Sequence, residues 1–103
     1  SMRAAMKRRP TTPGEILQEE FLTPLGLSQK ALADHLGCDL KVINRVVNGR
    51  MRIGAALALR LGAALNTTPE FWLNAQKAVD LFDEVQKGAS LPTPLFRRAA
   101  EST

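Results

Sequence analysis

A tight break between two short helical segments constrains the fold of this chain more than any other feature. Ser28 is a residue type that caps helix N-termini, and apolar side chains recur on one face of the segment 29–36 that follows it. Gly37 can adopt the left-handed conformation that ends a helix, and Asp39 can cap a second helix over residues 40–47. Because so short a connection makes the two helices cross closely, the sequence predicts a tightly packed helical pair.

Three further helices are predicted around this pair. A first helix begins near the capping residue Thr12 and ends before Pro24. An apolar stripe at helical spacing predicts another helix over residues 55–65, and a last helix opens at Thr68 and reaches roughly Gln86. We therefore expect an all-α fold with five helices and no strand.

The chain has 103 residues, 45% of them hydrophobic, which suits one globular domain. Residues 1–11 carry several basic side chains, and we predict that they form a flexible arm. We predict a helical domain over residues 12–87, whose last helix serves dimerisation. Glycine, serine and proline end the helical pattern after it, so that residues 88–103 are expected to be a mobile tail.

The residue inventory excludes several classes of protein. A single cysteine cannot form an internal disulfide, and one cysteine with one histidine cannot make a zinc site on their own. No apolar run approaches the roughly 18–20 residues of a membrane span, and the N-terminus lacks the apolar stretch of a signal peptide. We expect a cytoplasmic protein without metal, cofactor or membrane contact.

Positive charge is concentrated in the middle of the chain. The formal net charge is +4, and the isoelectric point is about 9.8. No Asp or Glu occurs between Leu40 and Thr68, whereas acidic residues occur on both sides of this stretch. Its basic residues are Lys41, Arg45, Arg50, Arg52 and Arg60. This distribution favours a nucleic acid as the partner, and the alternative is a solvated basic surface.

Three residues in and around the helical pair stand at separations typical of the DNA-binding helix-turn-helix. Ala33 is small and lies one turn before Gly37, so the second helix of the pair can cross closely. Gly37 supplies the positive φ of the turn, and Ile43 fills the angle between the helices. The combination predicts that the second helix of the pair enters the major groove of DNA.

The outward side of that helix carries side chains suited to reading base edges. The residues predicted to do so are Leu40, Lys41, Asn44 and Arg45. Lys and Arg can donate to guanine O6 and N7, Asn can pair with adenine, and Leu can touch a thymine methyl group. For Asn44 the alternative is support of the helix end. The residues predicted to contact phosphates are Gln29, Asn48, Arg50 and Arg52.

The last helix is predicted to form a dimer interface. The residues expected there are Phe71, Trp72 and Val79. Phe71 and Trp72 are adjacent and point roughly 100° apart, so we expect one in the core and the other toward a second copy, in either order. Apolar residues outside the main stripe, such as Leu81 and Val85, support an interface over simple core packing.

No arrangement of nucleophile, base or metal ligands is recognisable in the sequence. His35 has no Ser, Cys or acid spaced to serve it, and Cys38 is interpreted as a small side chain in the turn. Asp80, Asp83 and Glu84 are interpreted as a solvated helix face, which a basic partner could also contact. We therefore predict a protein that is not an enzyme.

Residues 28–50, SQKALADHLGCDLKVINRVVNGR, resemble the helix-turn-helix of the phage-repressor-like (XRE) superfamily. Three blocks resemble HigA-type antitoxins of type II toxin–antitoxin systems: TTPGEILQEEFLTPLGLSQ (11–29), INRVVNGR (43–50) and ALALRLGAALNTTPEFWLNAQKAVDL (56–81). The resemblance covers roughly residues 7–82. It departs at Gly54, where relatives usually carry a better capping residue, and in the longer tail beyond Phe82.

The resemblance implies a five-helix phage-repressor-like domain that forms a homodimer, binds a palindromic operator in double-stranded DNA and represses its own operon. It also implies a partner, a small basic ribonuclease toxin that the antitoxin neutralises. Three alternatives remain: a stand-alone helix-turn-helix regulator without a toxin, an adaptor that has lost DNA contact, and an enzyme. Lys41, Asn44 and Arg45 argue against the adaptor, because a helix that no longer reads DNA has no reason to keep them.

Overall fold

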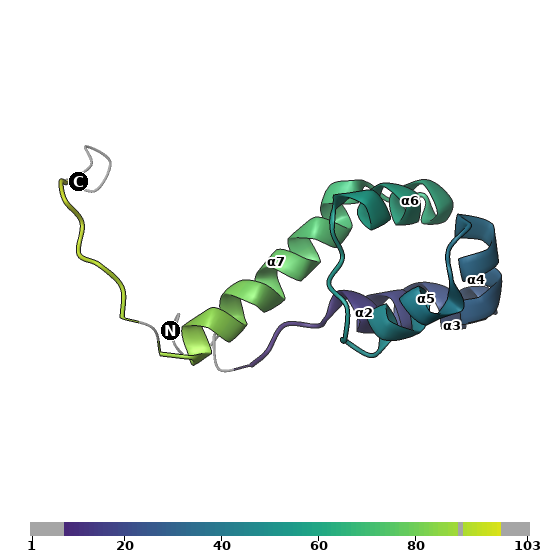
Figure 1. Cartoon of the computed structure of the whole chain (residues 1–103), viewed down its shortest axis with the longest axis horizontal. Coiled ribbons are helices and arrows are strands. Elements are labelled where there is room, and N and C mark those ends of the chain that lie inside the picture. Colours follow the sequence, from purple (N-terminus) through teal and green to yellow (C-terminus); the bar gives the residue numbers. More distant parts are fainter. Residues whose placement is uncertain (1–7, 89, 98–103) are drawn as a thin grey trace.

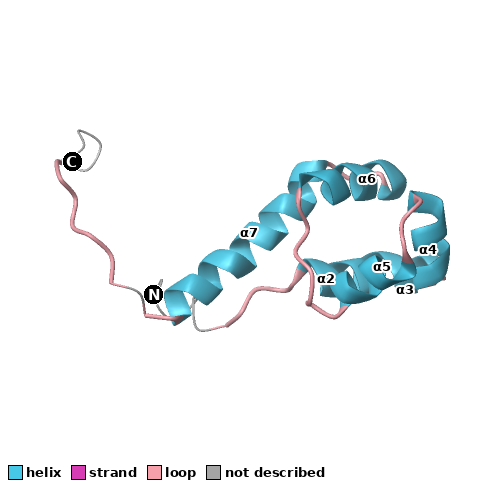
Figure 2. Ribbon diagram, viewed as in Figure 1, coloured by secondary structure: helices cyan, strands magenta, loops and turns pink. Residues whose placement is uncertain are grey.

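The computed structural model describes residues 8–88 and 90–97, and within these residues every regular element is a helix (Figure 1; Figure 2). The elements are α2 (Pro13–Ile16), η1 (Leu17–Leu22), α3 (Thr23–Leu25), α4 (Gln29–Leu36), α5 (Leu40–Val47), α6 (Ala55–Leu65) and α7 (Pro69–Gln86). Because α2, η1 and α3 follow one another without a break, the described chain forms five helical units, which confirms the predicted all-α fold. Parts of the predicted arm (1–7) and of the predicted tail (89 and 98–103) lie outside the described residues.

The first helical unit continues past the point where it was predicted to end. It reaches Leu25 and includes Pro24, because its middle turn is π-helical. In that turn the Thr23 N–H donates to the Gln18 carbonyl, five residues back. A wider turn of this kind gives room for a proline ring that would strain a regular helix. It also brings Leu17 and Leu22, five positions apart, into the same core, where both are buried.

The two helices of the predicted pair begin and end where the sequence indicates. The Ser28 hydroxyl accepts a hydrogen bond from the Ala31 N–H at the start of α4, and Asp39 accepts one from Lys41 at the start of α5. Gly37 ends α4 with a φ of 72°, in the left-handed region. Local capping chemistry therefore sets both boundaries, and α5 is held across α4 by its buried residues Ile43 and Val46.

Helices α6 and α7 form the second half of the fold; α6 packs against α4, and α7 runs past α2 (Figure 1). Both have the predicted bounds, and the Thr68 hydroxyl caps α7 by accepting from the Phe71 N–H. Gly54 starts α6 without a side-chain cap, so this helix end lacks a hydrogen bond that a Ser or Asp would supply.

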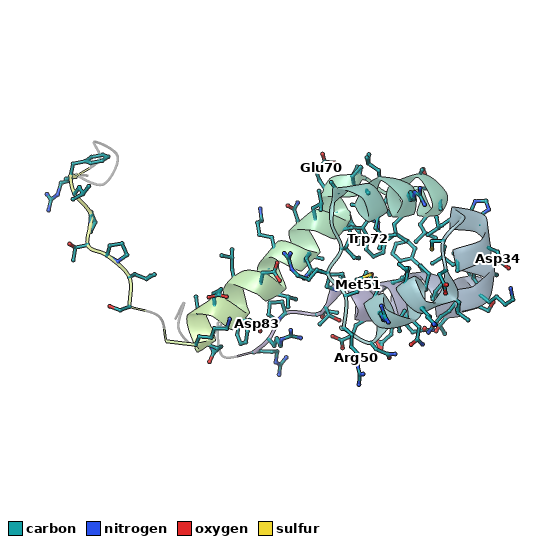
Figure 3. The ribbon with its side chains drawn as sticks, in the orientation of Figure 1. Asp34, Arg50, Met51, Glu70, Trp72 and Asp83 are labelled. Carbon is teal, nitrogen blue, oxygen red and sulfur yellow. The ribbon has the colours of Figure 1, made fainter. Side chains whose placement is uncertain are left out.

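Trp72 occupies the centre of the core, between α7 and the helices that face it (Figure 3). Its side chain is 0% exposed, and its indole N–H donates to the Thr67 hydroxyl at 2.8 Å. The rings of Phe21 and Phe71 pack against it, with centroid distances of 5.4 and 5.0 Å. The same core contains leucine and isoleucine side chains from the other helical units.

Two of the three residues predicted for a dimer interface are core residues instead. Trp72 is 0% exposed and Val79 is 4% exposed. The interface prediction is wrong for Val79, whereas Trp72 is the member of the Phe71–Trp72 pair that lies in the core, where one of the two was expected. Trp72, Gln76 and Val79 are spaced four and three residues apart, so they lie on one face of α7, and this face is the buried one. Phe71 lies about 100° around the helix from Trp72 and keeps 38% of its surface exposed.

Gly14 sets the distance between the first helical unit and α5. A Cβ atom at this position would lie 2.0 Å from the carbonyl oxygen of Val46 and 2.8 Å from that of Val47. No side chain fits there, so the N-terminal turn of α2 packs directly on the backbone at the end of α5. The placement of α5 therefore depends on this glycine.

Candidate nucleic-acid interface

The outer side of α5 gathers the four residues predicted to read bases. Leu40 is 44% exposed, and the other three, Lys41, Asn44 and Arg45, are also exposed. Together with Gln29 from the start of α4 they line a shallow hollow of about 230 Å³. We call the exposed side chains of Leu40, Lys41, Asn44 and Arg45 the reading face. The apolar side of α5 is buried, so the reading face is the side that remains free for a partner.

Three amide side chains at the reading face are joined by hydrogen bonds. The Asn44 Nδ2 group donates to Gln29 Oε1 at 3.2 Å. The Asn48 Nδ2 group donates to Asn44 Oδ1, also at 3.2 Å. We call this row of Gln29, Asn44 and Asn48 the amide chain. Asn44 therefore contacts both α4 and the end of α5, and two residues predicted to bind phosphates hold it in place.

The loop after α5 carries the other two residues predicted to bind phosphates. Arg50 is exposed and points away from the helices (Figure 3). Arg52 is exposed as well, but its guanidinium forms an ion pair with Asp80 of α7. The hydrogen bond between them raises the pKa of Arg52 and lowers the pKa of Asp80. Arg50 is thus free for a phosphate, whereas Arg52 already has an acidic partner.

A buried hydrogen-bond network attaches this loop to α7. Gln76 is the buried polar residue of the described chain, and its Oε1 atom accepts from the Ile53 N–H at 2.9 Å. Its Nε2 group donates to Asp80 Oδ1 at 3.0 Å, which links Gln76 to Arg52 as well. This network was not predicted from the sequence. Its one signal was a glutamine, four residues before an aspartate, within an otherwise apolar stripe.

The end of the predicted arm contacts α7 through a second ion pair. Arg9 donates to both carboxylate oxygens of Asp83, at 3.1 and 3.0 Å. These hydrogen bonds raise the pKa of Arg9 and lower the pKa of Asp83. Asp83 lies on the side of α7 toward the segment that leads into α2 (Figure 3).

The three late acids lie on a solvent-accessible face of α7, as interpreted, but two of them also form ion pairs that were not predicted. Asp80 and Asp83 pair with arginines that lie 28 and 74 positions away in the sequence. Glu84 accepts from Lys87 at 2.9 Å on the helix surface, which agrees with an exposed position. Long-range partners of this kind leave no periodic signal in a sequence, and for that reason they were not predicted.

The remaining residues considered in the sequence, His35, Cys38 and Arg60, form no recognisable catalytic or metal-binding group within the described residues. His35 is exposed and Cys38 is half-buried in the turn, as expected from their positions. Arg60 donates to the Leu36 carbonyl at 3.2 Å. In residues 8–88 and 90–97 no three potential ligands among His, Cys, Asp and Glu come together to hold a metal. None of the helices described has the length and apolar character needed to cross a membrane.

A short helical pair with a polar reading face on its second helix defines a helix-turn-helix protein, and the helix-turn-helix family model matches residues 18–72. Over 93 residues the chain is 46% identical to antitoxin HigA-1 of Vibrio cholerae, covering 87% of this chain and 88% of that protein. The chain therefore belongs to the HigA family of helix-turn-helix antitoxins. It is also 47% identical over 78 residues to an uncharacterized HTH-type transcriptional regulator of Haemophilus influenzae, covering 76% of this chain and 73% of that protein.

Solved structures of the same family have the same fold. Antitoxin GraA superposes with a TM-score of 0.77 at 42% identity, covering 84% of this chain and 99% of that one. The antitoxin HigA of Pseudomonas aeruginosa, solved with the higBA promoter, has a TM-score of 0.77 at 34% identity, covering 85% and 100%. GraA has also been solved in complex with its operator, with a TM-score of 0.70 at 41% identity, covering 84% and 95%.

Proposed function

We propose that this protein is a sequence-specific DNA-binding repressor of its own operon and the antitoxin of a toxin–antitoxin pair. The observation that carries the proposal is the reading face, which presents Lys41, Asn44 and Arg45 together on the free side of α5. The solved complexes of GraA with its operator and of the Pseudomonas antitoxin with its promoter support it. The proposed protein binds DNA and a toxin and catalyses no reaction, like the other antitoxins of its family. We propose that it acts in the bacterial cytoplasm, where its operator DNA lies.

In this proposal α5 lies in the major groove with its N-terminal part toward the bases. Arg45 and Lys41 donate to guanine O6 and N7, and Leu40 contacts a thymine methyl group. Arg50 donates to a phosphate beside the groove, and Arg52 does so when it leaves Asp80. The positive potential of this stretch of chain, free of acidic residues from Leu40 to Thr68, attracts the DNA.

We also propose that two copies bind a palindromic operator as a homodimer. The exposed side of α7 carries Phe71, Asn74, Ala78, Leu81 and Val85, at alternating spacings of three and four residues. This is the spacing of a seam between two helices. Phe71, Leu81 and Val85 are 38%, 60% and 50% exposed, which leaves a largely apolar stripe for a second copy to cover.

The oligomeric state is tested by sedimentation equilibrium. Leu81→Asp places a charge in the stripe and is expected to convert a dimer into a monomer. Ala31→Asp places the same charge on an exposed position of α4, outside the stripe, and should leave the dimer intact. A monomeric parent protein, or a dimer that Leu81→Asp does not weaken, would contradict the proposed interface.

The proposed protein partner is a small basic ribonuclease toxin, which the antitoxin neutralises. Support comes from family membership, through the 46% identity with antitoxin HigA-1. The test is co-expression with a small basic open reading frame beside this gene, followed by co-purification and an RNA-cleavage assay. A stable complex that suppresses cleavage is expected. If no adjacent reading frame encodes a binding partner, the protein is instead a stand-alone regulator.

DNA binding is tested by fluorescence anisotropy with DNA from upstream of the gene, against scrambled DNA of the same length, across a salt series. We expect strong preference for the upstream DNA. Arg45→Ala should weaken that binding by about 5- to 150-fold, the equivalent of one lost bidentate base contact. Lys77→Ala removes the same charge from α7 and serves as the matched control. Equal binding of both DNAs by the parent protein would refute the proposal.

A further inference from the structure

The amide chain gives each of its members a fixed orientation. Gln29 uses its carbonyl oxygen to accept from Asn44, and Asn48 uses its NH₂ group to donate to Asn44. Gln29 lies on α4 and Asn44 on α5, 15 positions apart, so the bond between them crosses the angle of the helical pair. Gln29 is half-buried, whereas Asn44 and Asn48 are exposed.

Each amide has hydrogen-bonding groups that the amide chain does not use. An amide side chain has two N–H donors and a carbonyl oxygen with two lone pairs. Asn44 donates one N–H to Gln29 and accepts from Asn48 with one lone pair, so one N–H and one lone pair remain for a ligand. In the described residues nothing accepts from the NH₂ group of Gln29, because its one bond is made by the oxygen.

The free groups match two neighbouring parts of a DNA duplex. Adenine presents an acceptor (N7) beside a donor (N6) in the major groove, which is the complement of one N–H and one lone pair. A phosphate accepts hydrogen bonds and would be repelled by a carbonyl oxygen. A phosphate next to Gln29 therefore favours the orientation seen here, in which the NH₂ group is free and the oxygen is turned to Asn44.

We propose that Gln29 and Asn48 are positioning residues that fix the Asn44 amide to read one adenine in each half-site. The NH₂ group of Gln29 donates to the adjoining phosphate and thereby couples phosphate contact to base reading. The inference rests on the proposed function, since it names the base that the reading face selects. It reassigns Asn48, predicted to bind a phosphate, to the support of Asn44. Holding an otherwise mobile side chain in place is worth about three- to tenfold in affinity.

Two substitutions at Gln29 separate its proposed contact with the phosphate from its orientation of Asn44. Gln29→Lys keeps a donor for the phosphate but removes the oxygen that accepts from Asn44. Gln29→Glu keeps that oxygen but turns a negative group toward the phosphate. We expect Gln29→Lys to retain its affinity for DNA that lacks the selected adenine while losing most of the preference for adenine. We expect Gln29→Glu to lose affinity for every sequence and to keep the preference.

The measurement is selection of binding sites from a duplex DNA library with a randomised centre, using the full chain and sequencing the bound fraction. Asn44→Ala defines which enriched adenine depends on Asn44, and Asn48→Ala should weaken the same preference about three- to tenfold. Arg50→Ala is the control, because it should weaken binding without changing the base preference. Thermal melts followed by circular dichroism establish that each variant is folded.

A second measurement removes the acceptor from the DNA instead of the protein. Replacing the selected adenine by 7-deazaadenine deletes N7 and should weaken binding by the parent protein, but by less than Asn44→Ala does, because the contact to N6 remains. It should have no further effect on Asn44→Ala. Unchanged adenine preference in Gln29→Lys, or an adenine that does not respond to Asn44→Ala, would overturn the inference and leave the proposed function intact. If the parent protein enriches no sequence at all, the proposed function fails, and the inference fails with it.

Discussion

Replacing Gly14 by alanine should destabilise the protein more than any other single added methyl group at a glycine of ordinary backbone conformation. The new Cβ would lie 2.0 Å from the Val46 carbonyl oxygen and 2.9 Å from its carbon. Real Cβ contacts do not fall below 3.0 Å, so α2 and the end of α5 must separate by about 1 Å. The obstacle is helix backbone, which cannot rotate aside as a side chain would.

The expected magnitude follows from two opposing effects. Overpacking costs about 1–3 kcal/mol and occasionally more. Alanine has a better helix propensity than glycine by roughly 0.8–1 kcal/mol, an advantage that is reduced in the first turn. Because two carbonyl oxygens block the site, we expect a net loss of about 2–3 kcal/mol in the free energy of unfolding. For a domain of this size that lowers Tm by roughly 10–20 °C.

Urea denaturation and calorimetry measure the change directly. Gly54→Ala is the matched control, because a Cβ there meets nothing within 4 Å, and it should cost about 0.5–1 kcal/mol, the difference between glycine and alanine as N-caps. Gly14→Ala should also weaken operator binding at temperatures where it remains folded, since α5 is displaced. A loss below about 0.5 kcal/mol for Gly14→Ala would refute the reasoning, because surface substitutions reach that size without any clash.

Three further predictions concern the caps and the network around α7. Gly54→Ser supplies the missing cap of α6 and should raise the free energy of unfolding by about a few tenths of a kcal/mol in urea titrations. Gln76→Leu leaves the Ile53 N–H buried without a partner and should cost about 1–3 kcal/mol. Gln76→Glu keeps the acceptor but places a buried carboxylate against Asp80 Oδ1 in place of the Nε2 donor, so it should cost at least as much. The Arg52 hydrogen bond lowers the pKa of Asp80 below its ordinary value of 3.8, so this contribution to stability is present above pH 3.8 and is lost as pH falls through the folded-state pKa. Asp80→Asn should therefore flatten the acid side of a stability–pH curve; an unchanged curve would show that the ion pair adds nothing.

Most helix boundaries and the composition of the reading face could be predicted from the sequence. Caps and left-handed glycines act over three or four residues, so Ser28, Gly37 and Asp39 fix the ends of α4 and α5 wherever these helices lie. The apolar stripe of α5 fixes its buried side, and Lys41 and Arg45 must then lie on the opposite side. The candidate site was found for this reason, since it is contained in one helix and its neighbour.

The remaining features depend on contacts between residues far apart in the chain. Which of Phe71 and Trp72 enters the core is decided by the rotation of α7 against the other helices, and no local pattern sets that rotation. Asp80 pairs with a residue 28 positions away, and Gln29 orients Asn44 across the angle between two helices. The sequence determined the helices and their polar faces, because hydrogen bonds and side-chain period act locally. Only the tertiary structure decided the partners of the charges and amides, because those depend on how the helices pack.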